Sequence, residues 1–109
     1  MNAKPVIPRE LANRDIDEAL DHFLSEGAAQ AALGFIDALE QAFAHIRLHP
    51  AAGSPRYAHE LSLPGLRSWP LARYPYVVFY VENTDSIDVW RVLHGKRHIP
   101  SWLHEDDNP

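Results

Sequence analysis

Apolar residues recur at helical spacing through the first half of the chain. Over residues 8–27 they return every three or four positions, with carboxylates between them. A second run over residues 28–48 follows the same spacing more closely. It ends at His49-Pro50, because the residue before a proline is disfavoured in a helix. The pattern predicts two helices joined at Gly27, which form a hairpin with one apolar face.

The second half of the chain has a shorter period. Runs rich in β-branched and aromatic residues cover 66–71, 76–81 and 87–93, and short polar links separate them. They predict three consecutive antiparallel strands, to which Val6-Ile7 can add an edge strand. The proline-rich segment 50–64 is expected to connect the two halves with little regular structure. The predicted fold class is therefore α+β, a helical hairpin packed on one face of a small antiparallel sheet.

Length and composition restrict this picture further. With 109 residues, the chain fits a single domain, which we place at residues 1–103, with a short helical turn near its end and an acidic, disordered tail at 104–109. No apolar run reaches the roughly 20 residues of a membrane helix, and the first residues lack the apolar segment of a signal peptide. We therefore expect a cytoplasmic protein without a membrane partner. The absence of cysteine leaves only nitrogen and oxygen chemistry.

The charge is uneven along the chain. The net charge of −5 argues against a general nucleic-acid binder, which usually carries a basic surplus. Residues 56–98 nevertheless hold six basic side chains against four acidic ones. A local basic surface on an acidic body is therefore expected.

Strand alternation separates the two faces of the predicted sheet. Tyr76, Val78 and Tyr80 fall on one face of their strand, and Arg91 opposes Trp90 on the last strand. On strict alternation, Val92 and His94 share the face of Trp90, and Leu93 shares that of Val89. A sheet covered by helices on one side leaves a second face, which here is expected to carry tyrosines, a tryptophan, arginines and a histidine. Such a face is either an ordinary amphipathic surface or a binding face, since aromatic residues and arginine are enriched where partners dock.

Three segments resemble one known family. The segments Leu66-Arg67-Ser68-Trp69-Pro70 and Tyr76-Val77-Val78-Phe79-Tyr80, and above all Arg91-Val92-Leu93-His94-Gly95-Lys96-Arg97, resemble the RelE/ParE toxin superfamily, in particular its ParE-like, plasmid-stabilisation branch. The resemblance covers nearly the whole chain. It implies a toxin of a type II toxin–antitoxin system, with DNA gyrase as target and a small DNA-binding antitoxin as partner. Contact with nucleic acid is then expected only through the antitoxin.

The resemblance also implies site residues and an alternative activity. One branch of the superfamily cleaves messenger RNA on the ribosome, and in that reading Arg67, His94 and Arg97 are the catalytic candidates. The positions where that branch has an arginine and a late tyrosine hold Tyr76 and Leu103 here, so a binding mechanism is favoured over catalysis. The residues expected to contact the target, or to maintain that face, are Arg67, Arg73, Arg91, His94 and Arg97. A third alternative is an inactive relative that acts only in autorepression with its antitoxin.

Histidine spacing raises the question of a metal. His45 and His49 are four residues apart, as are His94 and His98, a spacing that can ligate one ion. Neither pair has a carboxylate in a known ligand pattern, so we predict no metal and no cofactor. The apolar content of so small a chain predicts instead that an amphipathic antitoxin tail covers the helical hairpin and a sheet edge.

Overall fold

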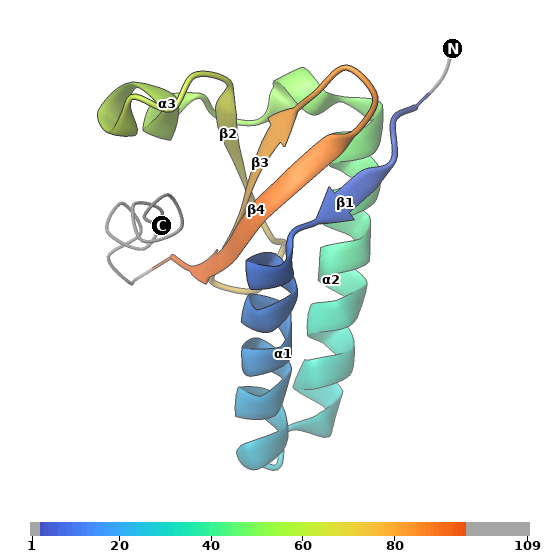
Figure 1. Ribbon diagram of the computed structural model, residues 1–109. Coiled ribbons are helices and arrows are strands. Elements are labelled where there is room, and N and C mark those ends of the chain that lie inside the picture. Colours follow the sequence, from blue (N-terminus) through green and yellow to red (C-terminus); the bar gives the residue numbers. More distant parts are fainter. Residues whose placement is uncertain (1–2, 96–109) are drawn as a thin grey trace.

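The computed structural model describes residues 3–95 (Figure 1). The elements are β1 (Val6–Pro8), α1 (Glu10–Ser25), α2 (Ala29–Leu48), the 3-10 turn η1 (Pro50–Ala52), α3 (Arg56–Leu61), β2 (Leu66–Pro70), β3 (Tyr76–Glu82) and β4 (Ile87–His94). The predicted helical hairpin, the three-stranded meander and the added edge strand are all present. The expected C-terminal helical turn and acidic tail lie outside the described residues. Within residues 3–95, no helix combines the length and the apolar character needed to cross a membrane.

The sheet has the strand order β1-β4-β3-β2. β2, β3 and β4 pair antiparallel, whereas β1 pairs parallel with β4 over three residues, so the sheet is mixed. The backbone of Arg9 donates to Val89 O at 2.9 Å just before α1 begins, which fixes the start of the hairpin at the sheet edge.

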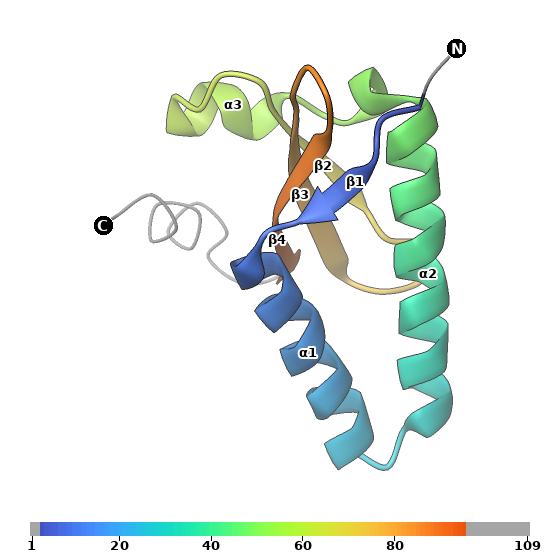
Figure 2. The same ribbon diagram turned by 45° about the vertical axis from the view of Figure 1, so that its right-hand side comes forward.

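The two faces of the sheet have different covers (Figure 2). α1 and α2 lie on one face, and α3 lies on the other. The expectation of little regular structure over 50–64 was wrong, since this segment contains η1 and α3. α3 forms because Tyr57, Ala58 and Leu61 bury against Phe79 and Leu66, and it ends at a left-handed Ser62.

The main core lies between the hairpin and the sheet. α2 contributes Phe35, Leu39 and Ile46, all buried. Its buried alanines, Ala38 and Ala42, let the helix approach the strands closely. The strands contribute Val78, Tyr80, Ile87, Val89 and Val92 to the same cluster.

A β-bulge in β4 changes which residues face the hairpin. Val89 pairs with Tyr80 and Arg91 with Phe79, so Trp90 is an extra residue. Val89 and Val92 therefore both face the hairpin, whereas Leu93 packs with Phe79 on the α3 side. The strict alternation predicted beyond Trp90 was wrong for this reason.

The tyrosines of β3 lie on the face of the sheet that the hairpin covers, whereas the sequence pattern predicted them on the uncovered face. The split between Tyr76, Val78 and Tyr80 on one face of β3 and Phe79 on the other is confirmed. However, the tyrosines point to the hairpin and not to an open binding face, because Tyr80 fills the core and Tyr76 packs against it. The other face carries a second apolar cluster, which includes Leu66, Phe79 and Leu93.

The outer edge of β2 is occupied by the chain itself. Ser54 forms a two-hydrogen-bond bridge with Ser68, with both N···O distances at 2.9 Å. Leu66 N donates to Leu63 O at 3.1 Å, and Pro70 has no N–H to offer. Little of this edge is left to pair with another strand.

Candidate functional site

Arg91, one of the predicted site residues, is buried against α1. Its Nε and Nη2 donate to the two carboxylate oxygens of Asp15 at 2.8 and 2.9 Å. The Val92 backbone N–H donates to the same carboxylate at 3.0 Å. The side chains of Arg91 and Asp15 are only 9% and 7% exposed. Of the two roles considered for Arg91, the geometry therefore fits maintenance of the fold.

Arg67 lies on β2 and holds the segment that follows α2. Its Nη1 donates to the carbonyl oxygen of Gly53 at 2.8 Å. Beside it, the Tyr80 hydroxyl donates to Pro50 O at 2.7 Å and accepts from Gly53 N at 3.1 Å. Burial raises the pKa of Tyr80, although the Gly53 N–H bond and nearby Arg67 act in the opposite direction. Gly53 is required here because a Cβ would collide with the Tyr80 hydroxyl.

Arg73 and His94 lie at the opposite end of the sheet from Arg67. Arg73 is exposed in the turn between β2 and β3, and Gly95 N donates to Pro75 O of this turn at 2.7 Å. His94 pairs in register with Tyr76, and their rings meet edge to face at 5.2 Å between centroids. Arg67 pairs instead with Tyr80, four residues further along β3. At about 3.3 Å per residue, the backbones of Arg67 and His94 are offset by about 13 Å along the strand direction, and β3 lies between their strands.

The predicted constellation is therefore only partly assembled. Arg73 and His94 share one end of the sheet, Arg67 lies at the other end, and Arg91 is buried. Arg97 lies outside the described residues. Tyr76 stands where the RNA-cleaving branch is expected to carry an arginine, and it packs as an aromatic residue on Phe35, with centroids 5.1 Å apart.

Sequence reasoning missed the residues that position these candidates. Tyr74 anchors the β2–β3 turn, because its hydroxyl donates to Ala31 O at 3.0 Å and its ring lies edge to face with Phe35. The hydroxyl occupies the space that a side chain on Gly34 would need. A glycine within an otherwise regular helical pattern was the one available signal, since such a glycine commonly marks a close approach.

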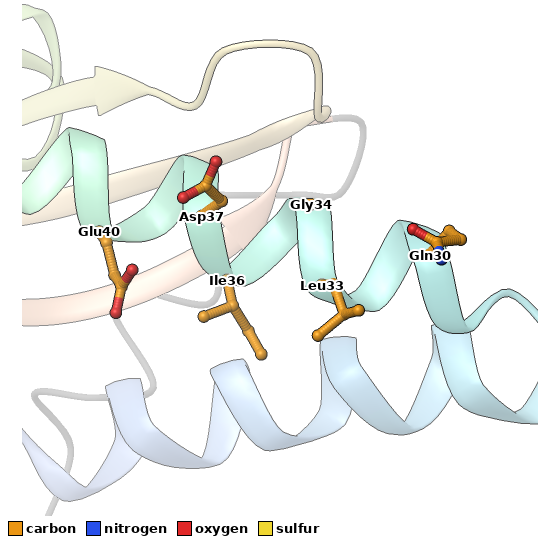
Figure 3. A pocket seen from close by; sticks show the side chains of 6 residues that line it. All are labelled: Gln30, Leu33, Gly34, Ile36, Asp37 and Glu40. Atoms are coloured by element: carbon orange, nitrogen blue, oxygen red, sulfur yellow. The ribbon is translucent and has the colours of Figure 1, made fainter.

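A second candidate surface is an open hollow on α2, about 430 Å³ in volume. Figure 3 shows the side chains that line it, with Leu33 and Ile36 directed from α2 toward α1. The lining residues are Gln30, Leu33, Gly34, Ile36, Asp37 and Glu40. Leu33 is 61% exposed and nearby Ile36 is 37% exposed, which is high for large apolar side chains on a small domain.

The helical hairpin that carries this hollow is acidic overall. The hairpin, residues 10–48, holds eight carboxylates against two arginines, a net charge of −6. Among the ion pairs of residues 3–95, only Asp15 and Glu10 of these carboxylates have a partner. Asp37 and Glu40, on the lining of the hollow, are therefore available to a positively charged partner.

The histidines give no metal centre within the described part of the chain. The rings of His45 and His49 lie 5.2 Å apart, but His45 stacks on Trp69 at 4.2 Å. No cluster of three or more potential ligands occurs among residues 3–95. His98 of the other pair lies outside this range.

Comparison with known proteins gives two results. A family model described as the ParE toxin of type II toxin-antitoxin system, parDE, matches residues 6–99. A solved structure titled "Chromosomal ParDE TA system from P. aeruginosa" has a similar chain, with a TM-score of 0.69 and 19% sequence identity. The match covers 84% of this chain and 96% of that one. No curated protein matches significantly.

Proposed function

Because the chain belongs to the ParE toxin family of type II toxin–antitoxin systems, we propose that it inhibits DNA gyrase in the cytoplasm and that a small DNA-binding antitoxin neutralises it. The proposed mechanism is binding to the target, not cleavage of RNA. The family membership, together with the arrangement of the candidate residues, supports it.

One observation carries the choice between binding and RNA cleavage. A metal-free ribonuclease needs cations at the developing phosphorane charge and a proton carrier within hydrogen-bond reach of the same phosphate. The Arg67 guanidinium donates to Gly53 O, and the Arg67 backbone is offset from the His94 backbone by about 13 Å along the strand direction. These two groups do not converge on one phosphate, which favours binding.

The antitoxin is proposed to cover the hollow on α2. Exposed Leu33 and Ile36 offer apolar anchor points, and Asp37 and Glu40 offer charge for lysine or arginine side chains beside them. An amphipathic segment that lays its apolar face on α2 would match both properties. A second copy of this chain fits less well, because its own hairpin carries the same net charge of −6.

A supercoiling assay tests the target. Purified gyrase and relaxed plasmid are incubated with increasing amounts of this protein, with and without the product of the adjacent reading frame. We expect supercoiling to fall, linear DNA from trapped cleavage complexes to accumulate, and the adjacent product to restore supercoiling. Normal supercoiling at saturating protein would refute the gyrase proposal.

Experiments in cells separate the alternatives. Induction should arrest division and raise the DNA-damage response without codon-specific cuts on primer extension. Cuts that disappear in His94→Ala would instead establish an endoribonuclease. Normal growth, combined with repression of the operon by the toxin–antitoxin pair, would identify an inactive relative.

A further inference from the structure

We propose that Arg73 is a target-contact residue of this toxin, held by the β2–β3 turn so that its guanidinium binds a carboxylate on the target protein. The inference rests on the proposed function and adds the chemistry of the contact. It follows from the backbone conformation of Arg73, from the contacts that anchor its turn, and from the exposure of its side chain, which bonds to no other described residue.

The backbone of Arg73 is in a conformation that L-residues disfavour. Its φ is +70°, in the left-handed region where glycine is the least strained residue. Two other turns of the described chain place a glycine there, Gly27 and Gly65. Ser62, the other non-glycine residue of residues 3–95 with positive φ, ends α3, where this conformation is usual. An arginine at position 73 is therefore an unfavourable choice for the turn itself, and such strain is typical of functional positions.

The turn around Arg73 is held on both sides. The hydroxyl of Tyr74, the next residue, donates to Ala31 O on α2, and its ring packs edge to face against both Phe23 and Phe35. Leu71 N donates to Tyr76 O at 2.9 Å, and Tyr76 N donates to Tyr74 O at 2.8 Å. These contacts fix the position of the Arg73 Cα, so less ordering entropy is lost when its side chain binds a partner.

The Arg73 side chain is not used within the described fold. Arg9, Arg14, Arg56, Arg67 and Arg91 each hold a carboxylate or a carbonyl oxygen. Arg73 is exposed and forms no hydrogen bond or ion pair with residues 3–95. Arg47 is similar, but it lies in the last turn of α2, where a cation stabilises the helix C-terminus. Arg73 has no such role.

A protein carboxylate is the partner that fits this group. A planar guanidinium can hold a carboxylate with two parallel hydrogen bonds, which suits a single fixed contact. Binding along a nucleic-acid backbone requires many cations, whereas this chain carries a net charge of −5.

The test compares Arg73→Gly with two matched controls. Arg73→Gly removes the cation and relieves the backbone, so we expect a melting temperature equal to or a few degrees above that of the wild type. Its potency in growth arrest and in gyrase inhibition should fall by at least about 30-fold, the lower limit of an interface hot spot. Ser62→Gly makes the same backbone change and Arg47→Ala the same charge change, and both should keep wild-type potency. Arg73→Lys, which keeps the charge without the fork, should be intermediate.

The outcomes separate this inference from the proposed function. Full potency of a folded Arg73→Gly variant would overturn the role of Arg73 and leave the toxin proposal intact. If the wild type arrests growth without inhibiting gyrase, only the gyrase assignment fails, and the loss of growth arrest in Arg73→Gly still supports Arg73. A wild type without any growth arrest would overturn both. If the protein binds a labelled DNA duplex without gyrase, and Arg73→Gly abolishes this binding, the group that Arg73 contacts is a phosphate. That result would refute a protein carboxylate as the partner.

Discussion

Replacing Asp15 with alanine should destabilise the protein more than any surface substitution. The change leaves the Arg91 guanidinium, 9% exposed, without its carboxylate, and leaves the Val92 N–H without an acceptor. Loss of one partner of a buried ion pair typically costs about 3–5 kcal/mol. The unsatisfied Val92 N–H lowers stability as well, by about 1–3 kcal/mol. The two costs are not fully additive, because the groups are neighbours. Because a domain of this size has about 5–15 kcal/mol of stability, the free energy of unfolding should fall by about a fifth or more.

Urea and thermal unfolding, followed by circular dichroism, measure this effect. At about 4–8 °C per kcal/mol for a domain of this size, we expect the melting temperature to fall by about 12–40 °C. Arg14→Gln is the matched control, because its ion pair with Glu10 is exposed at 66% and 81% and should change stability by less than about 0.5 kcal/mol.

A double-mutant cycle identifies the cause. Asp15→Leu combined with Arg91→Met removes both charges, and should recover much of the stability lost in Asp15→Leu alone. The reasoning would be refuted if the free energy of unfolding of Asp15→Ala lay within 1 kcal/mol of the wild-type value. It would also be refuted if the stability losses of Asp15→Leu and Arg91→Met simply added in the double variant.

Three further predictions concern single contacts. Gly53→Ala should lower the melting temperature by about 5–15 °C in a thermal scan, because the new methyl group collides with the Tyr80 hydroxyl and breaks its two bonds; an unchanged value would contradict the contact. Burial raises the pKa of Tyr80 above 10.0, so the stability due to its neutral hydroxyl is complete below pH 10 and is lost as the pH rises through the folded-state pKa. Urea titrations should therefore show that the wild type loses more stability above pH 10 than Tyr80→Phe does, and parallel curves would rule this out. Leu33→Asp should weaken antitoxin binding by at least about 10-fold in calorimetry, whereas Leu48→Asp, at a residue 66% exposed outside the hollow, should not; equal effects would exclude the hollow as the docking surface.

The architecture was predictable because long periodic patterns determine it. The hairpin followed from the apolar spacing over residues 8–48, and the meander from three β-rich runs with short links. α3 was missed because a six-residue helix spans fewer than two turns, too few for a period to stand out among prolines. The side-chain directions after Trp90 were wrong because one extra residue in β4 reverses the alternation, and nothing in the local composition marks it.

The candidate site was less predictable than the fold. The partner of Arg91 is Asp15, 76 residues away, and no local pattern links the two. Asp15 itself looked like one of several carboxylates on the polar face of a helix, although it is only 8% exposed. Arg73 could be named from the sequence as a cation in a turn, but its left-handed backbone and the Tyr74 anchor are visible only in the folded structure. Tertiary contacts decide these features, and residue type alone does not contain them.

The closed edge of β2 has a consequence for how this protein behaves at high concentration. An open edge strand is a template on which identical chains add to one another and grow into fibres. Here the backbone N–H and C=O of Ser68 are both hydrogen-bonded to Ser54, and the N–H of Leu66 donates to Leu63 O. Pro70 has no N–H. Self-propagating growth of the sheet is thus blocked at this edge by the chain's own connecting segment. At this edge, protection from fibre growth comes from the chain itself and does not depend on a partner strand.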